Sequence, residues 1–177
     1  MSRAILQIRP QTVEEAFLYI KNLFKKRKFY KDNGYAIDIP ENPIFTAVFN
    51  SPNETFEEKE NELKKIFTEE LYPKLYFSIA LSECEKIKPM VSERLAKIAA
   101  RPGFNLLDRY TIVLTPYGPG GSYDLSGIIV IKMNSQKPYL ERIIHEATHI
   151  GVEHEVLEKN LSHAEKEKLV EDICRNG

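Results

Sequence analysis

The stretch IIHEATHI, residues 143–150, holds two of the chain's four histidines. His145 and His149 are four residues apart, and on a helix this spacing places both imidazoles on one face, one turn apart. Zinc accepts imidazole nitrogens in a tetrahedral set, and a catalytic zinc site uses three protein ligands and a water. Glu146 follows the first histidine, where its carboxylate can take a proton from that water. The pattern predicts a catalytic zinc centre, although HExxH also arises by chance.

A third ligand is needed, and the residues after the motif offer candidates. Ser162 and Glu165 make a capping-box signature that opens a final helix. A short loop joins this helix to the HExxH helix, so the two should pack antiparallel. That packing brings Glu167, 18 residues after His149, back toward the histidines. Glu171 lies one turn further on the same face, where it can hydrogen-bond a ligating imidazole.

An HExxH motif, a loop and a glutamate on a second helix resemble the gluzincin group of zinc metallopeptidases, which includes thermolysin-like enzymes and minimal single-domain relatives. The resemblance covers roughly residues 110–177. It implies that His145, His149 and Glu167 bind Zn²⁺ and that Glu146 is the general base. The glutamate helix of that group carries Glu-x-x-x-Asp, whose aspartate braces a histidine. Glu171 occupies the aspartate position, so it would be the brace or, alternatively, the third ligand.

The resemblance also implies an antiparallel edge strand that lies over the zinc and binds an extended peptide. Other assignments within zinc chemistry are weaker. Metzincins use HExxHxxGxxH, but Gly151 and His154 each stand one position early, and one residue turns a helical side chain by about 100°. His163 is a further ligand candidate, an oxyanion donor, or simply a first-turn residue of the final helix. Tyr117 and Tyr123 are exposed-turn tyrosines that could donate to an oxyanion.

The elements that must position these residues follow from hydrophobic period and turn signals. Thr12 with Glu15 predicts a capping box and a first helix, and Ile44–Phe49 predicts a short strand. The β-branched runs 110–118 and 127–133 flank a segment dense in turn residues, which predicts an antiparallel hairpin. The HExxH helix follows Pro138. This order predicts an α+β fold that is zincin-like, with a helical N-terminal part, a hairpin or small sheet, and two C-terminal helices.

The bulk composition sets outer limits on organisation and partners. A chain of 177 residues is expected to be one domain, with a mainly helical part over about 1–105 of unknown role and a zincin-like catalytic core over about 106–177. The net charge of −1 argues against a nucleic-acid partner, and the basic run 25–28 is expected to be a solvated helix end. No run is long enough for a signal-peptide core or a membrane span, and the two distant cysteines, Cys84 and Cys174, suggest reduced thiols. We therefore expect a cytoplasmic protein without membrane partners.

These observations predict a zinc-dependent metallopeptidase that hydrolyses peptide bonds by a zinc-activated water, acting on a peptide or protein substrate. Two alternatives from other classes stay open. One is a non-catalytic domain with a structural zinc, in which the N-terminal part serves interactions. The other is a metal-free helical interaction domain in which the motif at His145 is a coincidence.

Overall fold

The computed structural model describes residues 4–52 and 54–176. Its helices are α1 (Val13–Lys25), α2 (Arg27–Asp32), α3 (Pro43–Asn50), α4 (Glu60–Ile66), α5 (Ser78–Ile98), α6 (Tyr139–Glu158) and α7 (His163–Asn176). Its strands are β1 (Ile5–Pro10), β2 (Arg109–Thr115), β3 (Gly121–Tyr123) and β4 (Ile128–Lys132). Short 3₁₀ and π turns, η1 (Glu57–Lys59), η2 (Phe67–Leu71) and η3 (Tyr72–Lys74), flank or extend α4. The fold is α+β, as the sequence predicts.

The four strands form one mixed sheet in the order β1-β2-β4-β3. β1, β2 and β4 run parallel, and only β3 is antiparallel to its neighbour, β4. The predicted antiparallel hairpin of runs 110–118 and 127–133 is therefore wrong, because these runs pair in parallel. The turn-rich segment between them contains β3, which takes the antiparallel position beside β4 through a tight turn. That turn ends at Gly127, whose φ of 95° favours glycine.

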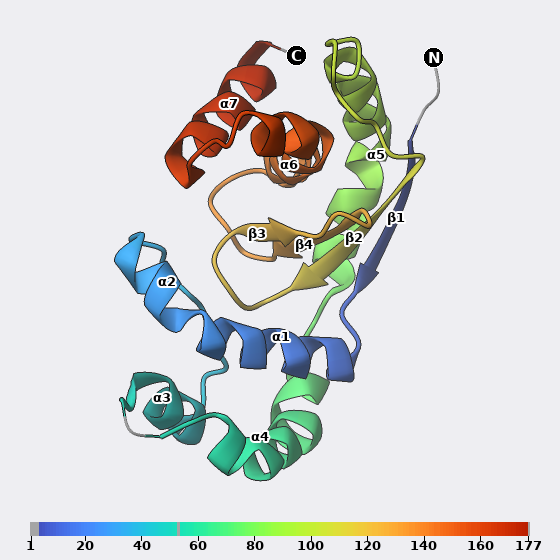
Figure 1. The fold of residues 1–177 in the computed structure, drawn as a ribbon. Coiled ribbons are helices and arrows are strands. Elements are labelled where there is room, and N and C mark those ends of the chain that lie inside the picture. Colours follow the sequence, from blue (N-terminus) through green and yellow to red (C-terminus); the bar gives the residue numbers. More distant parts are fainter. Residues whose placement is uncertain (1–3, 53, 177) are drawn as a thin grey trace.

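The sheet packs against α5 and α6, and the apolar faces of these elements form one core. In Figure 1 the sheet lies between α1 below and α6 and α7 above. β1 and α5, which come from the first part of the chain, contribute to the same core as β2, β4 and α6. Its fully buried members include Leu95, Tyr110, Ile112, Leu114, Ile129, Ile131 and Ala147.

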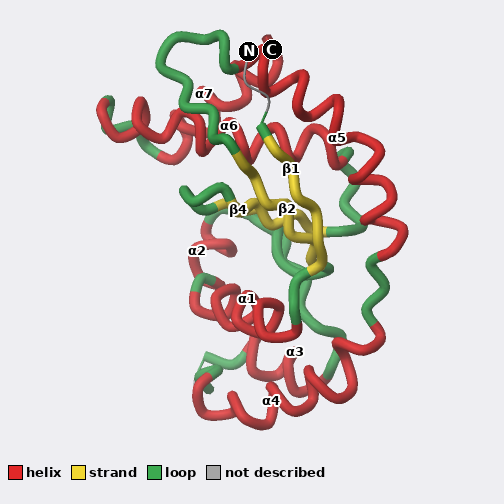
Figure 2. Tube along the Cα trace, turned by 90° about the vertical axis from the view of Figure 1, so that its right-hand side faces the viewer, coloured by secondary structure: helices red, strands yellow, loops and turns green. Residues whose placement is uncertain are grey.

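A second core is formed mainly by residues 13–74, which we call the N-terminal lobe (Figure 2), and Tyr117 from the loop after β2 is buried in it too. Rings of Phe17, Phe56 and Phe67 meet there at centroid distances of 5.4–5.9 Å. The Thr12–Glu15 capping box is confirmed at the start of α1. The lobe also shows that the predicted strand Ile44–Phe49 is wrong.

That segment belongs to α3, and its local sequence explains why. The side chain of Asn42 caps the helix by accepting from the backbone N–H of Ile44 at 2.9 Å, and Pro43 occupies the first helical position. Phe45 and Val48, three residues apart, then share the buried face. The run of β-branched and aromatic residues is typical of a strand, but the Asn42 cap and the spacing of the buried residues favour a helix.

Among the described residues, no helix is both long and apolar enough to cross a membrane.

Candidate metal centre

The HExxH residues lie in the middle of α6, the helix that packs over the sheet. Ile143, Ile144 and Ala147 are buried against the core, which fixes the rotation of the helix about its axis. The opposite arc of the helix carries His145 and His149, one turn apart. The motif is therefore held on a rigid element rather than on a loop, as a preorganised site requires.

The helix α7 supplies the carboxylate. The capping box at its start is present, since Ser162 and Glu165 exchange hydrogen bonds between side chain and backbone. Asn160, with a φ of 48°, turns the chain after α6, and the buried Val170 packs α7 onto Val152. Folding back in this way carries Glu167 to the histidines, as the short loop predicts.

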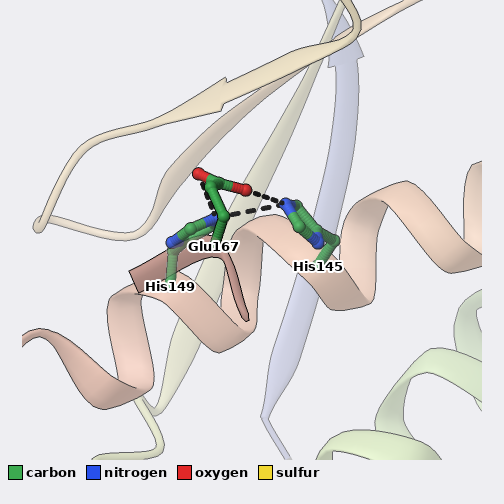
Figure 3. Close-up of side chains that lie close together, drawn as sticks. All are labelled: His145, His149 and Glu167. Carbon is green, nitrogen blue, oxygen red and sulfur yellow. Dashed lines mark hydrogen bonds and ion pairs between the residues drawn. The ribbon is translucent and has the colours of Figure 1, made fainter. Parts of the chain in front are cut away.

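Three ligand atoms converge between the two helices (Figure 3). The Nε2 atoms of His145 and His149 are 3.1 Å apart. Oε2 of Glu167 lies 3.4 Å from the first of these nitrogens, and its other oxygen, Oε1, lies 3.4 Å from the second. One ligand atom from each of the three residues lies within 4.8 Å of the other two. A tetrahedral zinc site with ligand bonds of about 2.0–2.1 Å separates any two ligand atoms by about 3.3 Å. The donor types are those that zinc prefers, and the nearest spacings are close to the edges of such a tetrahedron. The residues present therefore fit a zinc ion.

The protonation of the cluster also suits an ion. Burial lowers the pKa of His149, and the hydrogen bonds from His145 and His149 lower the pKa of Glu167 far below its ordinary range. Burial alone would lower the pKa of His145, but hydrogen bonds with Cys174 and Glu167 and the charges of Glu146 and Glu167 raise it overall. The short contact between the imidazoles needs one proton, and these opposite shifts place it on His145. A metal ion would replace that proton, because ligating imidazoles are neutral.

Glu146 lies next to the cluster and is almost fully enclosed, with 9% of the residue exposed. Burial raises the pKa of Glu146 to about 7, and the charge of Glu167 adds to that effect. A general base works best with a pKa near the working pH. Strand β3 lies against this carboxylate so closely that a Cβ on Gly121 would lie 2.4 Å from its Oε1.

No family of known proteins matches this chain, and no curated protein or solved structure matches it either.

Glu171, the predicted brace or alternative ligand, faces another way. Its Oε2 accepts a hydrogen bond from Arg175 at 3.2 Å, and its side chain is 55% exposed. The metal-capable group found among the described residues contains Glu167 and the two histidines but not Glu171. Cys174 lies near the first histidine instead: it raises the pKa of His145, and its thiol donates to the hydroxyl of Thr148 at 3.5 Å.

The other sequence candidates have distinct surroundings. The ring of Tyr123 stacks on His149 at a centroid distance of 5.1 Å and an interplanar angle of 11°, which supports that imidazole from β3. Tyr117 is buried in the N-terminal lobe beside Phe67, away from the histidines. His154 is exposed and pairs with Glu158, so the metzincin arrangement is not formed.

Two residues near the cluster escaped sequence reasoning. Tyr35, which follows α2, lies 3.2 Å from His163, and the pKa of Tyr35 is raised by burial and by the charges of Glu167 and Glu146. Tyr19 on α1 is partly buried, which raises its pKa, and the charge of Glu146 raises it further. Both come from the N-terminal lobe, more than a hundred residues before the motif, and no short-range pattern links them to it.

Proposed function

We propose that this protein is a zinc-dependent metallopeptidase of the gluzincin type, with a zincin-like core built from the sheet, α6 and α7. The proposal rests above all on the convergence of His145, His149 and Glu167, whose nearest ligand atoms are 3.1–3.4 Å apart, close to the spacing in a tetrahedral zinc site. Chance placement of HExxH on a helix would not bring a third donor of the right type to the same point.

The surrounding residues support hydrolysis. A zinc ion bound there would act as a Lewis acid and lower the pKa of a coordinated water to about 7. Glu146 would take the proton from the attacking water and pass it to the departing amine. Its burial excludes bulk solvent, and the positive charge of an ion would hold it as the carboxylate that a base must be.

Strand β3 supports a peptide substrate. It is one of the two edge strands of the sheet, paired with β4 on one side, and it runs beside α6 at Glu146. An extended chain can add to such an edge through main-chain hydrogen bonds. The backbone of Gly121 would then align the scissile bond with the cluster.

A catalytic centre is favoured over a closed structural zinc by the exposure of its ligands. The side chains of His145 and Glu167 are 31% and 33% exposed, so one side of the cluster faces solvent. Structural sites fill all four positions with protein ligands, whereas catalytic sites leave one open.

Both cysteines are free thiols, which fits a reducing compartment, and we propose that the enzyme is cytoplasmic.

Metal analysis and two substitutions test the proposal. The chain purified without added zinc should hold about one zinc per molecule and should cleave members of a fluorogenic peptide library. Glu146→Gln should keep the metal and lose cleavage, while Glu167→Gln should lose both. A chain without metal would overturn the proposal in favour of a metal-free scaffold. Metal without cleavage in the unmodified chain would favour a structural zinc.

A further inference from the structure

An arm of the N-terminal lobe reaches the metal centre. Residues 27–38, which we call the arm, comprise α2 and the segment after it, and α2 projects from the end of α1 on the same side of the molecule as α7 (Figure 1). At the first residue of α7, the hydroxyl of Tyr35 lies 3.2 Å from Nε2 of His163. The ring of Phe29 meets the same imidazole edge-on at a centroid distance of 5.9 Å.

The position of Tyr35 is fixed from both ends of the arm. Its ring packs on Phe29 and Tyr30 at centroid distances of 6.4 and 6.1 Å. Beyond it, Asp38 exchanges backbone hydrogen bonds with Gly118 and forms a 2.7 Å ion pair with Lys132 at the end of β4. The arm is therefore tied to the sheet, and Tyr35 is held at its place rather than left on a loose loop.

The imidazole of His163 links Tyr35 to the candidate ligand Glu167. The hydroxyl of Tyr35 can donate to Nε2 of His163, and the imidazole then carries its proton on Nδ1. Nδ1 lies 3.9 Å from Oε1 of Glu167, one helical turn away. That distance is too long for a direct hydrogen bond, so the N–H acts on the carboxylate as an oriented dipole or through a water.

We infer that Tyr35 and His163 are positioning residues for Glu167, through which the N-terminal lobe completes the metal centre. The inference rests on the proposed zinc site and gives the N-terminal lobe a role in it. Partners of a ligating carboxylate orient it, and their loss costs about 10-fold to 100-fold in metal affinity. Since Tyr35 is 40% exposed and the His163 side chain 47% exposed, we expect the lower end of that range.

Zinc affinity of the full chain, measured by chelator competition, tests the inference. Tyr35→Phe and His163→Ala should each weaken zinc binding about 10-fold, and the double variant should be no weaker than His163→Ala, because the two act in series. His163→Asn, which keeps an amide donor near the position of Nδ1, should recover part of the loss. Tyr30→Phe and His154→Ala are matched controls on the arm and on α6, and their affinities should equal that of the unmodified chain.

Linkage supplies a second measurement that needs no catalysis. If the arm strengthens zinc binding, zinc must stabilise the arm. Zinc should therefore slow amide exchange over residues 29–37 in the unmodified chain and not in Tyr35→Phe.

The outcomes separate the two proposals. An unmodified chain that binds no zinc overturns the metal centre itself. An unmodified chain that binds zinc as tightly as Tyr35→Phe and His163→Ala leaves the centre standing and overturns the positioning role. Unchanged zinc affinity with a lower kcat would likewise overturn it and would assign Tyr35 to the substrate.

Discussion

Gly121 sets the position of the general base, and replacing it with alanine isolates that base from the metal. A Cβ at this position would lie 2.4, 2.9 and 3.0 Å from Oε1, Cδ and Cγ of Glu146, whereas ordinary contact begins at 3.4 Å. The carboxylate must therefore move by about 1 Å. Because Glu146 is enclosed and the contact runs along its side chain, rotating the carboxylate alone does not relieve the clash.

A displacement of about 1 Å from productive geometry costs on the order of 100-fold in rate. We expect Gly121→Ala to lower the kcat for a fluorogenic peptide library by about that factor. Zinc content should stay unchanged, since the new methyl group is directed at Glu146 and not at His145, His149 or Glu167. Elemental analysis, peptide turnover and thermal unfolding on the same preparation measure the three effects separately.

The neighbouring glycine provides the control. A Cβ on Gly120 meets no atom within 4 Å, so Gly120→Ala adds the same methyl group to the same segment without a clash. If Gly121→Ala cleaved peptides as fast as Gly120→Ala, the contact with Glu146 would not limit the reaction. The role of Glu146 as the base would then have to be abandoned or its position revised.

Three further perturbations have defined outcomes. Cys174→Ala removes the thiol beside the first histidine and should weaken zinc binding about 10-fold by chelator competition, whereas Cys84→Ala, in the α5 core, should leave affinity unchanged. Gly151→Ala places a Cβ 2.2 Å from the ring of Phe104. It should lower the free energy of unfolding, measured with urea, by about 1–3 kcal/mol. The pKa of Glu15 is lowered to about 2, first by its hydrogen bonds from Arg9 on β1. The contribution of this pair to folding stability is therefore present above about pH 4.5 and is lost as the pH falls toward 2. Both side chains are partly exposed, so Glu15→Gln should cost about 1 kcal/mol at pH 7 and almost nothing at pH 2.

Short-range signals in the sequence predicted the local parts of the structure. The capping boxes at Thr12 and Ser162 start helices where expected, and HExxH lies on a helix. Glu167 reaches the histidines because a short loop leaves two helices few ways to pack. Each of these features depends on residues close together in the chain.

Apart from the strand predicted over Ile44–Phe49, where the helix cap at Asn42 is a local signal, the errors and omissions concern contacts that local patterns do not encode. β3 follows β2 in the chain but lies at the edge of the sheet, on the far side of β4, so β2 and β4 become parallel neighbours. Hydrophobic alternation alone does not reveal this strand order. The approach of Tyr35 to His163 joins residues 128 positions apart and depends on how the arm leaves α1. In the sequence, Cys174 indicates only a reduced thiol. Its position beside His145 follows from the rotation of α7 about its axis.

The candidate ligands occupy only residues 145–167, outside the core of the N-terminal lobe. Closing a loop of this length carries a small entropy cost, so zinc could clasp the last two helices together without help from residues 13–74. Zinc would then be held by α6 and α7, whereas Tyr35 on the arm would adjust its affinity through His163. On heating or partial proteolysis, we expect the chain to keep zinc, with a lower affinity, after the N-terminal lobe has lost its structure. Zinc binding would then persist after catalytic activity is lost.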